Sequence, residues 1–318
     1  HSFGCNPCSE IILRPYQFCN LSEVVVRYDD TLETLKEKVR VATIFGTYQA
    51  TLTDFKYLRK VWQNNCEEEA LLGVSLTGLM DHYVLSKTED AKRWLSEMKQ
   101  VAIDTNKEWA EKLGINQATA ITCVKPSGTV SQLVDSASGL HARHSEYYIR
   151  TVRGDNKDPM TQFMKEQGIP NEPDLIHSED NTVFSFPSKS PKKAITRNEM
   201  TAIDQLEVWK MYAEHWCEHK PSATISVRED EWPSVGAWVW ENFDICSGIS
   251  FLPTDDHVYQ QAPYQDCSKE EYDNHVALMP KSLDWGALAE FEKGVDNTSG
   301  ARELACTAGS CEIVDIAS

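Results

Sequence analysis

The sequence predicts an α/β fold, because stretches with helical periodicity alternate with short β-prone runs. Apolar residues recur at helical spacing over residues 30–52, 88–114 and 200–219. The β-prone runs between and after these helices are residues 118–124, 147–153, 182–187, 223–228 and 247–252. Strands that are separated by helices of this length favour parallel pairing.

Each predicted helix has its own local signals. The first places apolar side chains near one face, and these are Leu32, Leu35, Val39, Val41 and Ile44. In the second, Thr88 is a plausible N-cap and Gly114 stands where a C-terminal glycine is expected. The third, "MTAIDQLEVWKMYAEHWCEH", is expected to end before Pro221.

Composition excludes several classes of function. The chain has 318 residues, of which 41% are hydrophobic and 25% charged, as in ordinary globular proteins. No run approaches the ~20 apolar residues of a membrane span, and no apolar signal segment is present. A formal net charge of −18 argues against non-specific binding to DNA or RNA, although a local cluster of donors could still hold a single nucleotide.

Ten cysteines are spread along the chain. Secreted disulfide scaffolds are usually short and densely bridged, so this distribution predicts a reducing cytoplasm and directs attention to thiol chemistry. The sequence begins with His1, which suggests processing, trimming or a split gene.

The opening stretch "NPCSEIILRPYQFCN" combines thiols with a carboxylate and an amide. Cys8 and Glu10 are two residues apart, so both can face one ligand in an extended loop, and Asn6 shares their parity. A thiol beside a carboxylate base suits radical or acid–base chemistry on a hydroxylated substrate. The alternative, which the spacing alone favours, is a loop with two unremarkable buried cysteines, Cys8 and Cys19.

A second motif, "TCVKPSGTVSQL", reads as a strand, a turn and the start of a helix. Small hydroxylated residues and free backbone N–H groups at a helix N-terminus favour an anion such as phosphate. The candidate residues are Pro126, Ser127, Gly128, Thr129 and Ser131, with Lys125 adding charge. The order of residues does not match a Walker A loop. An ordinary turn with a Ser/Thr helix cap is the alternative.

Two further cysteine-containing patterns are weaker. From Lys293 the chain is rich in small residues and contains Cys306 and Cys311, whose C-x4-C spacing suits a reversible disulfide that exchanges with another dithiol. Two idle surface cysteines are the alternative, and the tail offers no further metal ligands. His215 and His219 have helical i, i+4 spacing but fit a helix face near a bend better than a metal site.

Taken together, these motifs resemble one family, the ribonucleotide reductases. "NPCSE" resembles the finger loop of the large subunit, "KPSGTVS" its phosphate-binding loop, and the Cys8–Cys19 spacing and the C-x4-C tail fit the same pattern. "SGISFLPTDDHVYQQAPYQDC" and "HWCEHKPSATISV" are similar to barrel segments of the adenosylcobalamin-dependent class II enzymes, and "KPSGT" is similar to their monomeric, phage-like branch. The resemblance runs over nearly the whole chain.

The resemblance implies a fold: the C-terminal half of a ten-stranded α/β barrel over residues 1–292, with the finger loop, residues 4–20, at its N-terminus. It also implies a phosphate loop at residues 125–132 and a flexible redox-active tail at residues 293–318. An N-terminal half, from a split gene or lost from this chain, would complete the barrel.

The resemblance also implies roles. Cys8 would form the thiyl radical that takes the 3′-hydrogen, Glu10 would accept the 3′-hydroxyl proton, Asn6 would hold the sugar hydroxyls and Cys19 would be one of two reducing thiols. The loop residues Lys125, Pro126, Ser127, Gly128, Thr129 and Ser131 would bind the substrate phosphates. Cys306 and Cys311 would pass electrons from thioredoxin or a similar dithiol. The expected cofactor is adenosylcobalamin, and the phage-like branch goes with triphosphate substrates.

Several alternatives stay open. No cysteine in the chain suits the second reducing thiol, because Cys5 is too close to Cys8. A class I large-subunit fragment would need a radical-relay tyrosine pair, and Tyr147-Tyr148 follows the phosphate loop too directly to serve. The glycyl-radical segment of class III enzymes is not matched by the tail. A thiol-rich redox-relay protein or an inactive remnant of a split reductase are the non-catalytic alternatives.

Overall fold

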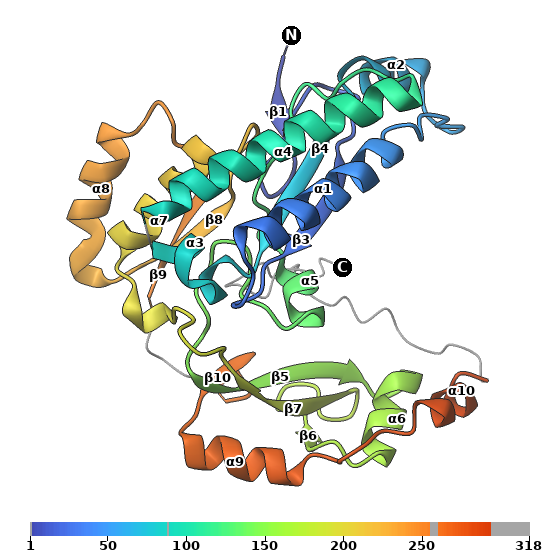
Figure 1. Cartoon of the computed structure of the whole chain (residues 1–318). Coiled ribbons are helices and arrows are strands. Elements are labelled where there is room, and N and C mark those ends of the chain that lie inside the picture. The colour runs from blue at the N-terminus through green and yellow to red at the C-terminus, as the bar shows by residue number, and fades with distance from the viewer. Residues whose placement is uncertain (1, 88, 255–259, 294–318) are drawn as a thin grey trace, which may run out of the picture. The chain divides into compact units, whose positions relative to one another are not determined.

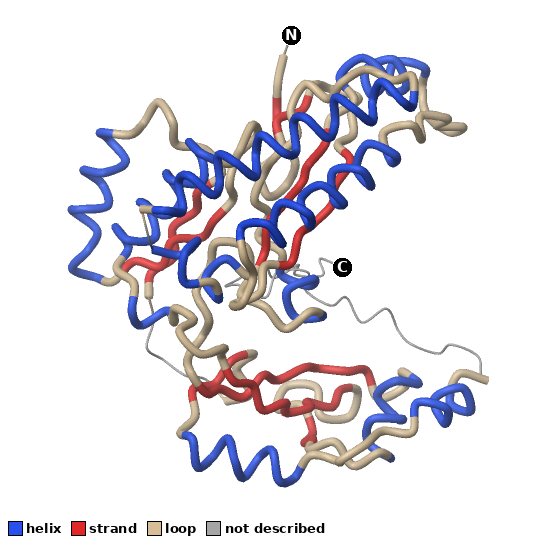
Figure 2. The backbone as a smooth tube through the Cα atoms, in the orientation of Figure 1, coloured by secondary structure: helices blue, strands red, loops and turns tan. Residues whose placement is uncertain are grey.

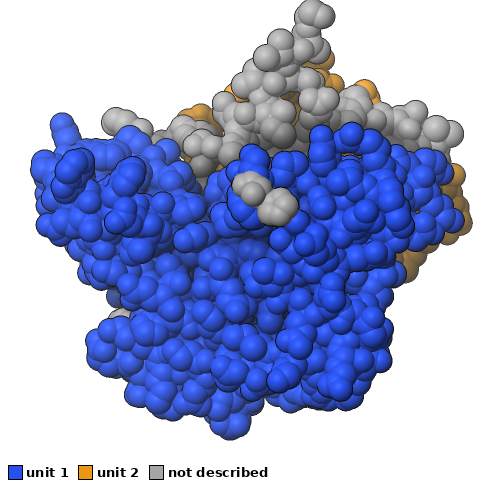
Figure 3. Space-filling model, turned by 90° about the horizontal axis from the view of Figure 1, so that it is seen from above, with its two compact units in different colours: residues 1–143, 191–255, 308–310 blue, residues 144–190, 256–307, 311–318 orange. Residues whose placement is uncertain are grey.

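The computed structural model describes residues 2–87, 89–254 and 260–293, and the chain divides into two compact units. Unit 1 contains residues 2–143 and 191–254, and unit 2 contains residues 144–190 and 260–293 (Figure 3). The sequence had predicted a single catalytic region up to residue 292, without this division. Across the described ranges, no helix combines the length and the apolar character that crossing a bilayer requires.

Unit 1 is built on a row of parallel chain segments. β3 (Asn20–Val25) pairs with β4 (Leu72–Thr77), and β8 (Ala223–Val227) pairs with β9 (Ile249–Pro253). A short extended segment joins the two pairs, because parallel bridges link Thr122 to Val74 and Val124 to Pro221. Five segments therefore lie side by side in one direction, in the order β3, β4, residues 120–124, β8 and β9 (Figures 1 and 2).

Helices connect these segments and cover one face of the row. The helices of unit 1 are α1 (Leu32–Gln49), α2 (Lys60–Glu69), α3 (Tyr83–Lys87), α4 (Asp90–Leu113), α5 (Gly128–Leu133), α7 (Ala202–His215) and α8 (Trp232–Glu241). α1 packs on β3 and β4, α7 packs on β8, and α4 contacts both helices (Figure 1). The predicted helices are confirmed as α1, α4 and α7.

The ends of these helices differ slightly from the prediction. α4 ends at Leu113 and is capped by Gly114, whose φ of +67° is the left-handed conformation expected of a C-terminal glycine. The predicted cap Thr88 lies outside the described residues. α7 ends at His215, several residues before Pro221, because the chain turns there to bring residues 218–222 beside the 120–124 segment.

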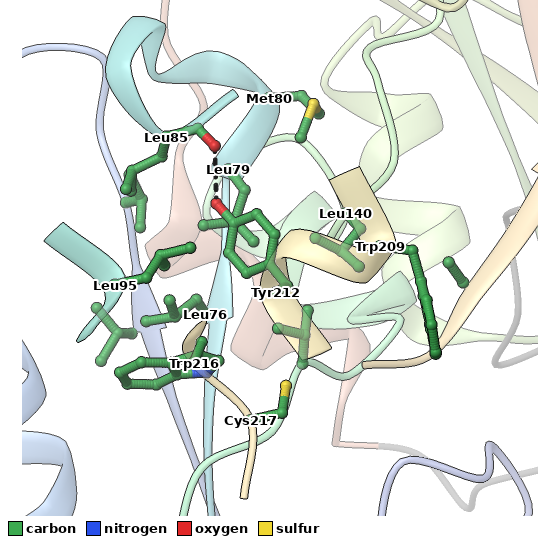
Figure 4. Packing of buried hydrophobic residues seen from close by; sticks show 14 of the residues in the cluster. Leu76, Leu79, Met80, Leu85, Leu95, Leu140, Trp209, Tyr212, Trp216 and Cys217 are labelled. Carbon is green, nitrogen blue, oxygen red and sulfur yellow. Dashed lines mark hydrogen bonds between the residues drawn. The ribbon is translucent and has the colours of Figure 1, made fainter. Parts of the chain in front are cut away.

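The core of unit 1 lies between the row and its helices. Leu72, Val74 and Leu76 of β4 are fully buried on this side, together with large side chains from α7 and the residues that follow it. Figure 4 shows Trp209, Tyr212 and Trp216 packed among leucines, and the Tyr212 hydroxyl donates a hydrogen bond to the Leu85 carbonyl oxygen at 3.0 Å. The polar atoms of these aromatic residues are thus satisfied inside the core.

The opposite face of the row is polar. Side chains alternate across a strand, so residues between the buried leucines of β4 point away from the helices. On neighbouring strands Glu23 is the register partner of Ser75, and Cys123 and Lys125 have the same parity. This face of the row, with its adjoining loops, is called the polar face below.

Unit 2 contains an antiparallel sheet. Its strands are β5 (Tyr147–Asp155), β6 (Asn171–Pro173), β7 (Asn181–Lys189) and β10 (Tyr264–Asp266), in the order β10-β5-β7-β6. Its helices are α6 (Pro159–Glu166), α9 (Lys269–Leu278) and α10 (Leu288–Phe291). All three strand pairs are antiparallel.

The prediction of parallel pairing is therefore wrong for β5 and β7, although both strands form where expected. α6 has eight residues and rises about 12 Å. β5 has nine residues and extends about 30 Å. The connection over residues 156–180 does not carry the chain back to the start of β5. Asn181 is the register partner of Asp155, so β7 begins beside the end of β5 and runs back along it.

Candidate functional site

The opening motif forms a short hairpin. β1 (Gly4–Cys5) pairs antiparallel with β2 (Ile12–Leu13). At its tip, the Asn6 Oδ1 atom accepts a hydrogen bond from the Ile11 N–H at 3.0 Å, and the Asn6 carbonyl accepts one from the Ser9 N–H at 2.9 Å. Ser9 has a φ of +64°, which reverses the chain between Cys8 and Glu10. In this structure the Asn6 side chain therefore shapes the turn.

Two glycines allow the hairpin to pack closely on the row of parallel segments. A Cβ atom at Gly73 would lie 3.2 Å from Ile11 Cδ1 and 3.3 Å from the Cys19 sulfur. Gly248 has a φ of +68°, and a Cβ atom there would lie 3.3 Å from the Ser9 carbonyl oxygen. The closest approaches are to Leu21 Cδ2 at Gly73 and, at 2.8 Å, to the Pro221 carbonyl oxygen at Gly248. A larger residue at either position would therefore disturb the row as well as the hairpin.

Glu10 is completely buried at the junction of the hairpin and the polar face. Its Oε1 atom accepts a hydrogen bond from Lys125 Nζ at 2.9 Å, and its main-chain carbonyl accepts one from the Lys220 N–H at 2.9 Å. Among the described residues, no donor reaches its Oε2 atom. Glu10 thus has one oxygen committed to a cation and one buried oxygen that holds no hydrogen bond within the described residues.

Thiols surround this ion pair. Cys8 is half-buried and close enough to Lys125 to act on its charge. Burial first, and then the Glu10 carboxylate, raise the pKa of Cys19 to about 12. Burial also raises the pKa of Cys123 well above its usual range, with Cys217, Cys19 and Glu10 adding to the effect. Cys19 and Cys123 are therefore protonated thiols at neutral pH, able to give up hydrogen.

The predicted phosphate loop lies next to Lys125. Ser127 is buried, has a φ of +56° and is the N-cap residue of α5. Its hydroxyl donates to Glu23 Oε2 on β3 at 2.7 Å. Burial raises the pKa of the Glu23 carboxyl, and the Ser127 hydrogen bond opposes that shift.

The rest of the loop is divided between surface and interior. Thr129 is exposed on α5, whereas Ser131 is buried and donates to the Gly128 carbonyl oxygen at 3.2 Å. Ser138 closes the loop from below by donating to the Pro126 carbonyl at 2.8 Å. The loop is therefore held in place by its own hydroxyl groups.

Comparisons with known proteins place this geometry in context. No family model matches the chain. It is 27% identical over 98% of its length to an adenosylcobalamin-dependent ribonucleoside-triphosphate reductase of Lactobacillus acidophilus, and 27% identical over 98% to a probable one of Dictyostelium discoideum. The chain spans 45% and 40% of these relatives.

Solved structures show the same fold. A crystal structure of a B12-dependent class II ribonucleotide reductase matches 92% of this chain and 44% of its own, with a TM-score of 0.79 and 22% identity. The alpha subunit of a class Id ribonucleotide reductase from Actinobacillus ureae matches 79% of this chain with a TM-score of 0.51 and 14% identity. The chain is a homologue of the adenosylcobalamin-dependent class II ribonucleotide reductases.

The structure brings together most of the residues that the sequence singled out in this reductase homologue. The hairpin with Cys8 and Glu10, the thiol of Cys19 and the turn from Lys125 to Ser127 all lie on the polar face of unit 1. Lys125, predicted to add charge for phosphate, contacts Glu10. Cys306 and Cys311 lie outside the described residues.

The remaining candidates have other surroundings. His219 is buried, with its Nε2 atom 2.8 Å from the Leu72 carbonyl oxygen, while His215 Nδ1 lies 3.4 Å from the Ser96 hydroxyl. Tyr147 and Tyr148 both lie on β5 of unit 2. Cys5 is exposed, and the eight cysteines in the described part of the reductase homologue form no disulfide.

Sequence reasoning missed Cys123 and Glu23. Cys123 falls inside the quoted motif "TCVKPSG", two residues before Lys125, so the parity of an extended segment could have placed it on the same face. Glu23 required the pairing of β3 with β4, which no local pattern specifies. The partner of Lys125 likewise depends on a contact between residues that are 115 positions apart.

Proposed function

We propose that this chain forms the substrate-reducing part of a class II ribonucleotide reductase, converting ribonucleoside triphosphates to 2′-deoxyribonucleotides. The observation that supports this most is the gathering of the Cys8 and Cys19 thiols and the Glu10 carboxylate beside the Lys125–Ser127 turn. The names of the relatives state a triphosphate substrate and adenosylcobalamin. Because the chain spans less than half of those relatives, a complementary polypeptide is expected to supply the remaining strands.

In this proposal, the row of five parallel segments is one half of a barrel. β3 and β9 stand at the two edges of the row, with no strand paired to their outer sides among the described residues. Such edges accept further strands through their unpaired N–H and C=O groups. The complementary polypeptide would close the barrel over the polar face and keep water from the thiols.

The reaction assigns a balanced task to each group. The Cys8 sulfur radical takes the hydrogen atom from C3′, while Glu10 Oε2 accepts the proton of the 3′-hydroxyl group. The 2′-hydroxyl group leaves as water after receiving a proton from a thiol. Cys19 and a second thiol on the complementary polypeptide become a disulfide, supplying two electrons and two protons, one proton to the leaving water and one to C2′. Glu10 returns its proton to the 3′-oxygen. Cys8 then returns its hydrogen atom to C3′, and Asn6 holds the hydroxyl groups of the sugar.

The described residues suit a cobalamin cofactor next to Cys8. The thiol is half-buried at a hairpin tip, and Phe3 and Pro7 are exposed on the same hairpin, where they offer an apolar surface to a macrocycle. When bound, adenosylcobalamin supplies the one-electron oxidation of a thiol. Cys8 would be the thiol that is oxidised. The hairpin, which packs against Gly73 and Gly248, holds its sulfur in place.

The loop from Lys125 to Ser131 would bind the substrate phosphates through its backbone N–H groups and hydroxyls. Ser127 would exchange its hydrogen bond with Glu23 for one with phosphate. Cys306 and Cys311, which the sequence alone singles out, would recharge the buried thiols with electrons from thioredoxin or a similar dithiol.

Equilibrium dialysis with a ribonucleoside triphosphate tests the binding part of this proposal. The full chain should bind the nucleotide, and Ser127→Ala should weaken binding by about tenfold, the effect of one charge-assisted hydrogen bond. Ser96→Ala, on the helix-covered side of unit 1, is the matched control and should bind normally. A chain that binds no nucleotide, with or without a complementary half, would favour a thiol relay or an inactive remnant instead.

A further inference from the structure

We propose that Lys125 is a positioning residue for Glu10: it holds the carboxylate ionised and turns the Oε2 atom toward the ligand. This inference deepens the proposed function and rests on it for the role of Glu10 as a base. It also assigns Lys125 to the carboxylate and away from the phosphates.

The contact between the two residues is direct and partly enclosed. Lys125 Nζ lies 2.9 Å from Glu10 Oε1, and the exposed fractions of the two side chains are 27% and 0%. The Glu10 side chain is shielded from solvent, and an isolated charge in such a place is costly. Lys125 is therefore the group that allows a charged carboxylate at this position.

Lys125 also remains charged beside Glu10. Burial alone would lower the pKa of Lys125, but the hydrogen bond and the charge of Glu10 outweigh it and raise the pKa above the usual range. Cys8 and Cys123 add to the same effect. Lys125 is thus an ammonium at neutral pH, and Glu10 Oε2 is left without a hydrogen-bond partner among the described residues.

The backbone fixes where the ammonium can be. The Lys125 N–H donates to the Ser75 hydroxyl at 2.9 Å, and the Val124 N–H donates to the Lys220 carbonyl at 3.3 Å. Lys220 in turn donates its own N–H to the Glu10 carbonyl. Lys220 therefore links the backbones that carry the two members of the ion pair, which limits the directions open to the Glu10 side chain.

Other titratable groups face the pair from each surrounding element. They are Cys8 on the hairpin, Cys19 before β3, Glu23 on β3, Cys123 on the extended segment and His219 after α7. Burial lowers the pKa of His219, and the thiols of Cys19 and Cys123 are held protonated, so these three groups are neutral near pH 7. Lys125 is the cation that contacts Glu10 directly.

Infrared difference spectroscopy on the full chain tests the proposal without any turnover. In Lys125→Met, Glu10 should become protonated, giving a carboxylic acid band at pH 7 that vanishes in the Lys125→Met/Glu10→Gln double variant. Lys125→Arg should keep the charge and show no band. Lys36→Met is the matched control, because Lys36 is 25% exposed and pairs with Glu97 on the helix layer at 2.6 Å. An ionised Glu10 in folded Lys125→Met would overturn the proposal.

Activity in the presence of a complementary half gives a second measurement. Lys125→Met should lower kcat by about 10²–10⁴-fold at pH 7, the usual contribution of a general base, and recover toward higher pH. KM for the nucleotide should stay nearly unchanged. A raised KM with normal kcat would instead identify Lys125 as a phosphate ligand. If the unmodified protein has no reductase activity, the proposed function fails while the infrared result still decides the role of Lys125.

Discussion

The two faces of the parallel row in unit 1 differ in character: one packs against the helices, and the other bears the thiols and charged groups of the candidate site. On β4, Leu72, Val74 and Leu76 point into the helix layer, while Gly73 and Ser75 point to the polar face. Residues adjacent in sequence thus meet either a dry apolar core or a cluster of thiols and charges. This contrast indicates that alternate positions along one strand serve stability and chemistry separately. Substitutions on the helix-covered face should lower stability, and substitutions on the polar face should mainly lower activity.

The largest expected effect is on the polar face. Cys8→Ala should reduce ribonucleotide reduction to background in the presence of a complementary half and cobalamin, because the other thiol of the hairpin, Cys5, is exposed and contacts the Ser9 hydroxyl. Nucleotide binding should persist, and the free energy of unfolding should change by about 0.5 kcal/mol or less, as for other partly exposed sites. Product assays and denaturant unfolding check the two halves of this expectation. Substantial deoxynucleotide product from Cys8→Ala would contradict the assignment of the chemistry to the polar face.

Substitutions at two neighbouring positions of β4 compare how much each face contributes to the free energy of unfolding. Leu76→Ala should lower the free energy of unfolding by about 2–5 kcal/mol, because it leaves a cavity in the helix-covered core. Ser75→Ala should cost about 1–3 kcal/mol through the unsatisfied Lys125 N–H. Urea unfolding of the two variants measures both values. A larger loss for Ser75→Ala would mean that the polar face also carries much of the fold's stability.

The smallest expected effect concerns pH. Because the pKa of Glu23 is raised, the folded chain holds this proton more strongly than the unfolded chain does. The contribution of Glu23 to stability should therefore fall as pH rises from about 4.5 upward, and Glu23→Gln should remove that fall.

The control for this prediction has the opposite sign. Hydrogen bonds from Gln63 and Thr53 lower the pKa of Glu67, so Glu67→Gln should weaken the fold at neutral pH relative to acid. Urea midpoints between pH 4 and pH 7 compare the two variants. A similar pH slope for Glu23→Gln and the unmodified chain would contradict the raised pKa of the half-buried Glu23 carboxyl.

Local patterns were sufficient for the elements but not for their pairing. The helices α1, α4 and α7 and the strands β5, β7, β8 and β9 form where periodicity and composition predict them. The antiparallel sheet of unit 2 was missed because pairing direction depends on how far each connection can return the chain. The expected strand at 118–124 contains bridges at Thr122 and Val124 but no regular strand.

In the candidate site, too, local motifs could be predicted and long-range contacts could not. Cys8, Glu10 and Cys19 were visible because they lie within one short motif. The contact of Lys125 with Glu10 and that of Ser127 with Glu23 join residues more than 100 positions apart, so only the folded row brings them together. The sequence predicted a cation near the phosphate loop, and the structure supplied its carboxylate partner.

Electron paramagnetic resonance tests the central claim, that the Cys8 sulfur is the one-electron oxidant of the substrate, most directly. The full chain, containing cysteine deuterated at Cβ, would be mixed with a complementary half, adenosylcobalamin and a ribonucleoside triphosphate, and then frozen. The account predicts a sulfur-centred signal whose hyperfine structure changes on deuteration and which Cys8→Ala lacks. The same signal in Cys8→Ala, or turnover without any cysteine radical, would contradict it.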